Sequence, residues 1–192
     1  MRDRPVKVKV RRKLFSNTKW HICADSIEDL KSGTTVEDYV VLEAITPRDD
    51  QVTGCTVLPI FEDRILLLRN YRHPAERYFW EAARGFIDPE EEPITAALRE
   101  VKEEVGLVAN THDVVPLGYC FPESSTMIAR AALFAIVGHA INTGSLDKSE
   151  PGLGQAQAFS FAEINQMMGD HEIEDATTCI AIDRFMRSRE LH

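Results

Sequence analysis

The sequence predicts an α/β protein, a mixed α/β sandwich preceded by a small β-rich region at the N-terminus. Three observations support this fold class. Short apolar or alternating segments typical of strands dominate the chain up to residue 137, one amphipathic helix interrupts them, and two helical segments close the chain. This order is expected when helices cover a sheet. The length of 192 residues and the 44% hydrophobic content suit one domain with an appendage.

Residues 1–50 are predicted to form the β-rich appendage, and residues 51–192 the main domain. Valines alternate with basic residues from Val6 to Val10, the period-2 pattern of a strand with one solvated face. Basic side chains on such a strand commonly protect an exposed edge, although a weak role in binding phosphate or nucleic acid stays open. The appendage is expected to contain two more strands, over 19–24 and 37–45, with polar turns over 25–33.

The main domain is predicted to begin with a hairpin over 54–69, in which two apolar runs meet at Glu62 and Asp63. The clearest helix spans 93–105, since a proline suits its first turn and Gly106 stands just past its end. The other expected elements are an irregular aromatic loop over 71–80 that enters another strand, strands over 114–121 and 128–137, a loop over 142–155, and helices over 161–168 and 176–189.

Charge and cysteine usage exclude several classes of protein. The formal charge is −9, and outside the basic residues 1–13 it is −15, which argues against a long nucleic acid as the main partner. The four cysteines stand far apart without a CxxC pair, so neither a zinc site nor a disulfide framework is indicated. No secretory signal and no apolar run of the ~18–20 residues needed to span a bilayer are found, so we expect a cytoplasmic protein with no membrane partner.

Acidic residues gather on the predicted helix in a way that needs an explanation. Glu100, Glu103 and Glu104 fall within an arc of about 100°, beside an apolar stripe that includes Ile94. Acids in the last turn repel one another and oppose the helix dipole. A divalent cation that prefers oxygen ligands, Mg²⁺ or Mn²⁺, would explain the cluster. On the cluster alone, a solvated acidic face paired with neighbouring basic residues explains it equally well.

A longer pattern surrounds these glutamates: Gly-x5-Glu-x7-Arg-Glu-U-x-Glu-Glu-x-Gly-U, where U is apolar. It is filled at every fixed position and resembles the signature of the Nudix hydrolase superfamily. The resemblance implies an α/β/α sandwich with a mixed sheet that hydrolyses nucleoside diphosphates linked to another moiety. The filled positions are Gly85, Glu91, Arg99, Glu100, Val101, Glu103, Glu104, Gly106 and Leu107.

The resemblance also implies roles, position by position. Glu100 and Glu104 would be direct ligands of the catalytic metal, Mg²⁺ or Mn²⁺, and Glu103 a ligand or a close neighbour of one. The backbone carbonyl of Arg84 would be a further ligand. Glu103 and Glu104 are therefore candidate catalytic residues, and Glu150 is the candidate for a loop glutamate that assists the attacking water.

Four residues of the pattern are expected to be structural. Glu91 would pair with Arg99 and hold the loop against the helix, while Gly85 and Gly106 would stand at the two ends of the box.

The flanking segments resemble the ADP-ribose pyrophosphatase branch of the superfamily. In that branch an apolar strand ends in R-Q-[YF]-R-x-P and W-E-x-P-A-G precedes the box, and residues 66–74 and 79–85 are similar to these two segments. The resemblance implies hydrolysis of ADP-ribose to AMP and ribose 5-phosphate, and an N-terminal region that helps to form a homodimer. Ala83 and Arg84 depart from the branch, so GDP-mannose or ADP-glucose remains open as substrate. An RNA 5′-pyrophosphohydrolase and a non-catalytic nucleotide-sugar sensor are the alternatives.

Arg69, Arg72, Glu81 and Arg84 are the candidate substrate-binding residues. Guanidinium groups bind phosphate in a bidentate manner, and Glu81 could reach a substrate ribose. Surface ion pairs and structural pairing explain Arg69, Arg72 and Glu81 equally well. Apart from His73, a candidate substrate contact, the histidines show no spacing typical of metal ligands.

Overall fold

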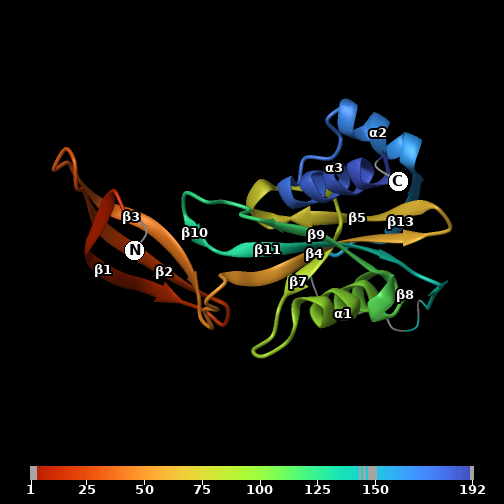
Figure 1. The fold of residues 1–192 in the computed structure, drawn as a ribbon, viewed down its shortest axis with the longest axis horizontal. Helices are drawn as coiled ribbons and strands as arrows, with labels where there is room; N and C mark the ends of the chain where they lie inside the picture. Colours follow the sequence, from red (N-terminus) through yellow and green to blue (C-terminus); the bar gives the residue numbers. More distant parts are fainter. Residues whose placement is uncertain (1–3, 143, 145, 147–150, 191–192) are drawn as a thin grey trace. The chain divides into compact units, whose positions relative to one another are not determined.

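The structure is a computed structural model that describes residues 4–142, 144, 146 and 151–190. The chain separates into two compact units, which are described one at a time. The first unit takes the chain up to residue 53 together with residues 121–130, and the second takes residues 54–120 and the chain from residue 131 onward. The α/β class with mixed sheets is confirmed (Figure 1). Among the described residues, no helix is both long and apolar enough to cross a bilayer.

The first unit is a four-stranded sheet in the order β1-β2-β3-β10. β2 is antiparallel to both β1 and β3, and β10 runs parallel to β3. The strands are β1 (Val6–Ser16), β2 (Trp20–Asp29), β3 (Thr35–Ala44) and β10 (Met127–Ile128).

The prediction of polar turns over 25–33 is wrong for residues 25–29, because β2 continues to Asp29. Arg11 stands opposite Asp25 across the β1–β2 ladder, and its guanidinium donates to both carboxylate oxygens at 2.8 Å. This cross-strand pair lets a buried aspartate occupy a strand. The alternating pattern of β1 predicts one solvated face. In the structure both faces of β1 are exposed, and Val10 is 53% exposed.

The second unit is built on a sheet in the order β13-β5-β4-β11-β9, to which β6 adds beside β5 and β7 beside β4. A two-stranded ribbon of β8 and β12 lies apart from this sheet. The strands are β4 (Val52–Phe61), β5 (Arg64–Arg72), β6 (Arg77–Glu81), β7 (Ala83–Phe86), β8 (Leu107–Val108), β9 (Val114–Cys120), β11 (Arg130–Val137), β12 (Ala140–Ile141) and β13 (Ala156–Ser160).

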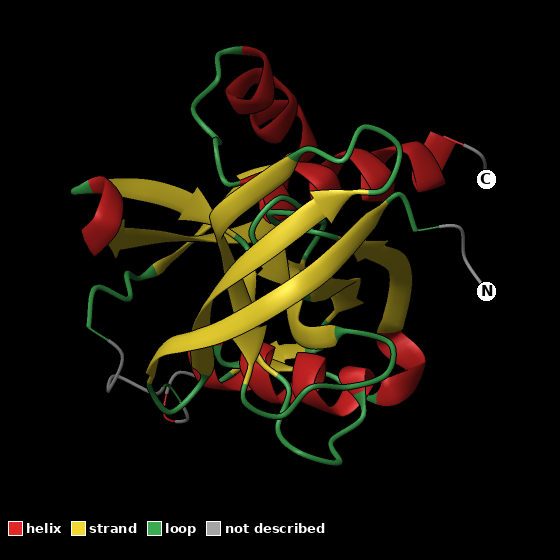
Figure 2. Cartoon of the chain, turned by 90° about the vertical axis from the view of Figure 1, so that its left-hand side faces the viewer, coloured by secondary structure: helices red, strands yellow, loops and turns green. Residues whose placement is uncertain are grey.

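Helices cover both faces of this sheet, which makes the unit a three-layer sandwich (Figures 1 and 2). On one face lies α1 (Pro93–Val105), and on the other lie α2 (Phe161–Gly169) and α3 (Ala176–Glu190). Buried aliphatic side chains such as Leu58, Leu133 and Ile182 form the core between the sheet and the α2–α3 layer.

Local signals placed α1 correctly. The helix begins at Pro93, and Gly106 ends it with a φ of 71°, while its N–H donates to the carbonyl of Lys102. Ile94 is 39% exposed, however, and the buried face extends to Glu100 instead.

The strand expected at the end of the loop over 71–80 is present as β6, but the preceding residues form a hairpin with β5 instead of an irregular loop. Strand β5 runs through Arg72, a single 3₁₀ turn (His73–Ala75) follows, and β6 pairs back along β5. Tyr71 and Tyr78 stand opposite each other with ring centroids 5.3 Å apart, an edge-to-face contact that favours the pairing.

Candidate active site

The centre of the site is the close approach of the α1 glutamates to strand β7. A Cβ built on Gly85 would lie 1.9 Å from Oε1 of Glu100, so only glycine leaves room for this carboxylate. Gly54 on the paired strand β4 is also required, because its Cβ would meet the Gly85 carbonyl oxygen at 2.7 Å. The two glycines therefore allow β4, β7 and α1 to pack closely enough to bury Glu100, which is 8% exposed.

Glu104 meets the same strand one residue earlier. Its carboxylate accepts the backbone N–H of Arg84 at 3.0 Å. Glu103, half-buried, lies one residue away on the same helix and accepts from Arg99 at 3.3 Å. The structure thus brings Glu100 and Glu104 against the peptide segment 84–85, with Glu103 beside them on the helix.

Arg99 links the helix to the loop before it. Its guanidinium binds Glu91 in a bidentate manner at 3.1 and 3.0 Å and donates to the Phe86 carbonyl at 3.0 Å. It also donates to Glu100 at 2.6 Å. The hydrogen bonds from Arg99 lower the pKa of Glu91, and those with Glu91 raise the pKa of Arg99. The Arg99–Glu91 pair therefore fixes the loop to the helix. The same guanidinium also contacts Glu100.

A second network lies beside the box and holds Glu81, which is 1% exposed. The Asn70 amide donates to it at 2.9 Å, Arg72 Nε at 3.0 Å, and an Arg84 guanidinium nitrogen at 3.1 Å. A buried carboxylate needs such partners, because desolvation of an unpaired charge is costly. Arg72, Glu81 and Arg84 thus meet in one cluster, and the substrate-binding roles expected of them stay predictions.

Arg84 reaches a second acid, Asp175, at 2.8 Å. Burial opposes ionisation of Asp175, but the charge of Arg84 and hydrogen bonds from Thr177 and Thr178 outweigh it, so the pKa of Asp175 is lowered. Asp175 also accepts the backbone N–H of Thr178, as an N-cap of α3 does. The Thr178 hydroxyl in turn accepts the N–H of Ala82 at 3.0 Å. The start of α3 is therefore tied to the strand that enters the box.

Arg69 stands apart from these networks. It is exposed on β5, and its guanidinium lies over the rings of Tyr78 and Trp80 at 5.5 and 5.6 Å. The other candidate, Glu150, lies outside the described residues.

Cys55 lies opposite Gly85 in the β4–β7 ladder but offers no nucleophile. Burial, with the nearby charge of Glu100, raises the pKa of its thiol to about 12. The thiol therefore stays protonated, and oxygen atoms dominate the donor set around Gly85.

Sequence reasoning missed one cluster entirely. His112, Asp113 and His139 place one potential ligand atom each within 4.8 Å of one another. The histidines are far apart in the sequence, and the pairing of β8 with β12 that brings them together leaves no periodic signal. Asp175 and Thr178 were also missed as site residues, because their contacts with β6–β7 depend on how α3 packs.

A family model described as the NUDIX domain matches residues 51–178. Three known proteins are also similar to this chain. "ADP compounds hydrolase NudE" of Escherichia coli (strain K12) is 44% identical over 54 residues, 28% of this chain and 29% of that protein. "ADP-ribose pyrophosphatase" of Bacillus subtilis (strain 168) is 26% identical over 121 residues, 63% of this chain and 64% of that protein. "ADP-sugar pyrophosphatase" of Mus musculus is 25% identical over 148 residues, 74% of this chain and 66% of that protein.

The alignments span less than two thirds of the length of the first two relatives. A solved structure described as "Crystal structure of ADP compounds hydrolase" superimposes with a TM-score of 0.79 at 21% identity, covering 97% of this chain and 95% of that one. At that identity the likeness shows a common fold. The family match includes both Gly85 and the α1 glutamates that crowd it, and the chain therefore belongs to the NUDIX domain family.

Proposed function

We propose that the protein hydrolyses the diphosphate bond of a nucleoside diphosphate sugar with the help of Mg²⁺ or Mn²⁺. ADP-ribose is the first candidate substrate, with AMP and ribose 5-phosphate as products. The observation that carries the proposal is the set of box glutamates placed against the peptide segment 84–85. The names of the relatives, which refer to ADP compounds, ADP-ribose and ADP-sugars, support the substrate class.

The residues present fit a hard divalent cation. Glu100 and Glu104 offer carboxylate oxygens next to residue 84, and the absence of a side chain at Gly85 keeps that space open to them. Oxygen donors of this kind are the ligands that Mg²⁺ and Mn²⁺ prefer. Glu100, Glu104, the Arg84 carbonyl and Glu103 would hold the metal. When bound, the metal would make a water molecule more acidic and neutralise charge on the diphosphate oxygens.

The protein's own groups would perform the remaining tasks. A carboxylate oxygen of Glu103 or Glu104 would accept the proton of the attacking water, and Glu150 is the loop alternative for that role. Arg99 keeps the helix and loop in register, so that these carboxylates stay in place. Arg69 is exposed beside two aromatic rings and could bind a phosphate or a base.

Other nucleotide sugars remain the alternative substrates. The Arg84 side chain stands where the ADP-ribose branch has alanine, and it is held by Glu81 and Asp175. This cluster lies directly before the box, so its shape could select the sugar or its phosphate. A non-catalytic sensor is disfavoured, because a binder has no need to keep repelling carboxylates at the end of a helix.

The test is product analysis by mass spectrometry after incubation with Mg²⁺ and a panel of ADP-ribose, nucleotide sugars and capped RNA. Glu104→Gln should lower the rate by about 100-fold or more while the protein stays folded. Glu92→Gln is the matched control, because Glu92 is exposed and its side chain makes no capping hydrogen bond. Full activity in a folded E104Q protein would refute the proposal, and tight ADP-ribose binding without turnover in the wild type would favour the sensor.

We also propose that the protein resides in a reducing compartment such as the cytoplasm, because all four cysteines are free thiols. We further propose that the N-terminal sheet forms a homodimer interface. Apolar side chains along β1 are exposed, among them Leu14 and Phe15 at 57% each. Exposed apolar patches of this kind mark interaction surfaces. Phe15→Glu should shift the sedimentation coefficient from dimer to monomer, whereas Lys31→Glu in an exposed turn should not.

A further inference from the structure

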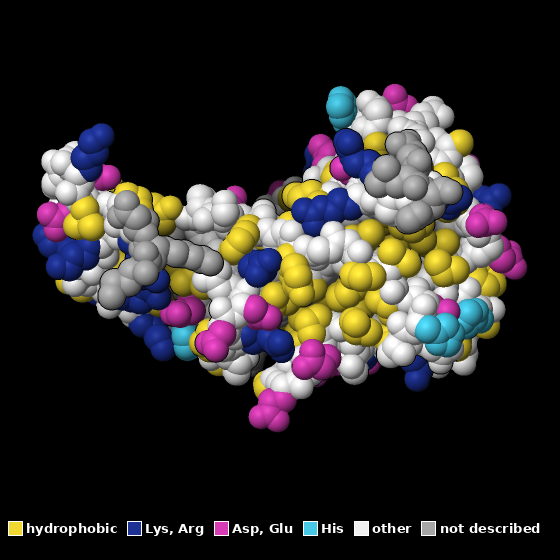
Figure 3. All heavy atoms as spheres, in the orientation of Figure 1, with side chains coloured by type: hydrophobic (Ala, Val, Ile, Leu, Met, Phe, Trp, Pro, Cys, Tyr) yellow, Lys and Arg dark blue, Asp and Glu magenta, His cyan; other side chains and the backbone are white. Residues whose placement is uncertain are grey.

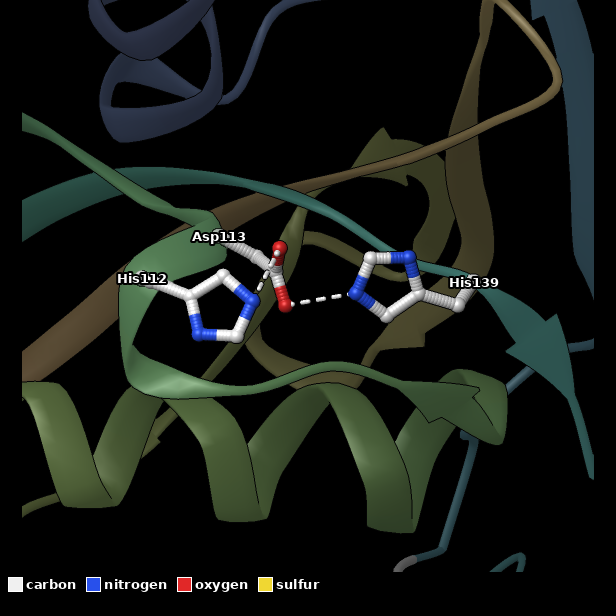
Figure 4. Close-up of side chains that lie close together, drawn as sticks. All are labelled: His112, Asp113 and His139. Atoms are coloured by element: carbon white, nitrogen blue, oxygen red, sulfur yellow. Dashed lines mark hydrogen bonds and ion pairs between the residues drawn. The ribbon is translucent and has the colours of Figure 1, made fainter.

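The cluster of His112, Asp113 and His139 lies outside the proposed active site and takes no part in the function described above. Figure 4 shows the two imidazole rings pointing at the Asp113 carboxylate from opposite sides. Nε2 of His139 is 2.8 Å from Oδ2 of Asp113, and Nε2 of His112 is 3.4 Å from Oδ1. Three groups able to bind a metal therefore lie together in one small cluster, with their ligand atoms within 4.8 Å of one another.

The backbone around the cluster is fixed on both sides. His139 begins the return of the chain along β8, and its N–H donates to the carbonyl of Val108 at 2.8 Å. The preceding residue, Gly138, has no room for a side chain, because its Cβ would lie 2.3 Å from a methyl carbon of Leu107. The backbone of His139 is thus held in place by the pairing of β12 with β8.

On the other side, His112 and Asp113 belong to a 3₁₀ turn (Thr111–Asp113), in which the Asp113 N–H donates to the Asn110 carbonyl at 3.0 Å. Oδ2 of Asp113 accepts the backbone N–H of Asn110 at 2.7 Å. The carboxylate is consequently oriented before any ligand arrives. Backbone donors that orient a ligating carboxylate in this way strengthen metal sites.

The imidazole rings themselves are open to solvent. The side chain of His112 is 74% exposed and that of His139 is 55% exposed, whereas the Asp113 side chain is 10% exposed. In Figure 3, histidine side chains gather on the surface of the second unit near β8. A cation could therefore reach the cluster from bulk water without a conformational change.

We propose that His112, Asp113 and His139 form a surface binding site for a late first-row divalent cation, with Zn²⁺ as the representative ion. Ligand atoms at about 2.0–2.1 Å from a tetrahedral zinc lie roughly 3.3 Å from one another. The two histidine–carboxylate separations, 2.8 and 3.4 Å, lie close to that value, and all three ligand atoms lie within 4.8 Å of one another, so side-chain rotation would bring them onto one ion. Two imidazole nitrogens and one carboxylate leave a fourth position for water.

The donor set separates this site from the box glutamates. Imidazole suits Zn²⁺, Cu²⁺ and Ni²⁺, whereas an all-oxygen set suits Mg²⁺ and Mn²⁺. Mg²⁺ should therefore not compete at the histidine cluster. Binding there would cross-link the 3₁₀ turn to the segment that leads into β12.

The test is isothermal titration of the tag-free full chain with Zn²⁺, in buffer with excess Mg²⁺ to compete at the glutamates. One Zn²⁺ per chain should bind, and His112→Asn or His139→Asn should weaken this binding by at least about tenfold. His171→Asn is the matched control, because His171 is exposed and lies outside the cluster. The Glu100→Gln/Glu104→Gln double variant should retain the site, which separates this result from the outcome of the proposed function.

Nuclear magnetic resonance gives an independent readout on the same samples. Substoichiometric Zn²⁺ should shift the ring signals of His112 and His139 together and leave those of His171 unchanged. Equal Zn²⁺ affinity in the wild type and in both cluster variants would overturn the proposal. Binding that disappears only in the glutamate double variant would also overturn it, and so would the absence of stoichiometric binding.

Discussion

Glu81 and Glu100 are two buried glutamates close to the same strand junction, and they are balanced in different ways. Glu81 receives hydrogen bonds from one amide and two guanidinium groups. Glu100 is pressed against Gly85 and shares the single guanidinium of Arg99 with Glu91 and Glu103. We expect a carboxylate with this many partners to belong to the scaffold. Acids that draw on the same guanidinium repel one another, and a bound metal would offset that repulsion.

The largest effect on activity is expected from Gly85→Ala, which tests whether Glu100 must lie against Gly85. The three atoms that a Cβ would meet all belong to the Glu100 carboxyl group, the end of a flexible side chain. We expect that group to move away, with a loss of activity of about 100-fold and little loss of stability. Steady-state kinetics and thermal unfolding would be compared with Gly169→Ala, where nothing lies within 4 Å. Equal activity in both variants would contradict the placement of Glu100 in the site.

Glu81→Gln tests whether Glu81 is part of the scaffold. A glutamine amide cannot neutralise Arg72 and Arg84, so the free energy of unfolding should fall by about 2–3 kcal/mol. Both arginines are partly exposed, which keeps the loss below that of a fully buried pair. Urea denaturation would measure it, with the exposed Glu172→Gln as control. If stability were unchanged while activity collapsed, Glu81 would be a substrate contact rather than part of the scaffold.

Thr178→Val should produce a smaller effect. Its hydroxyl accepts the Ala82 N–H and donates to Asp175 at 2.7 Å, and the residue is fully buried. Loss of the acceptor leaves a buried N–H without its partner, at a cost of about 1–2 kcal/mol. Thr177→Val is the matched comparison, because the Thr177 hydroxyl also donates to Asp175, at 2.8 Å, while the Ala82 N–H is bound by Thr178. A destabilisation by T177V as large as that by T178V would show that the bond to Ala82 contributes nothing.

The smallest expected effect concerns pH. Arg99 lowers the pKa of Glu91 in the folded state, so the pair contributes stability above the unfolded-state pKa of about 4.3. That stability is lost as the pH falls through the lower, folded-state pKa. Glu91→Gln should be less stable than the wild type at pH 7, and the difference should shrink between pH 5 and lower values. Urea denaturation of both proteins at a series of pH values measures this difference. If the ion pair had no role, the difference in the free energy of unfolding between the wild type and E91Q would be the same at every pH.

Local signals explain what could be predicted from the sequence. Pro93 and Gly106 mark the ends of α1 through backbone properties that need no tertiary partner. The spacing of the box predicted that Glu100 and Glu104 share a face, and the fold places both against β7.

Pairings between distant segments explain what could not be predicted. Asp25 remains in a strand because Arg11 binds it from across the ladder. His112 and His139 meet because β12 returns along β8, and strands of two residues are too short to show a period.

The bonds that tie the start of α3 to the strand before the box have a consequence for synthesis on the ribosome. Asp175 and Thr178, which bind Arg84 and the Ala82 N–H, are translated long after the box itself. Because a chain emerges from its N-terminus, a nascent protein can form the box helix while these partners are still missing. We therefore expect the nascent chain to stay inert, and to gain activity only when its final helix has been released and docked.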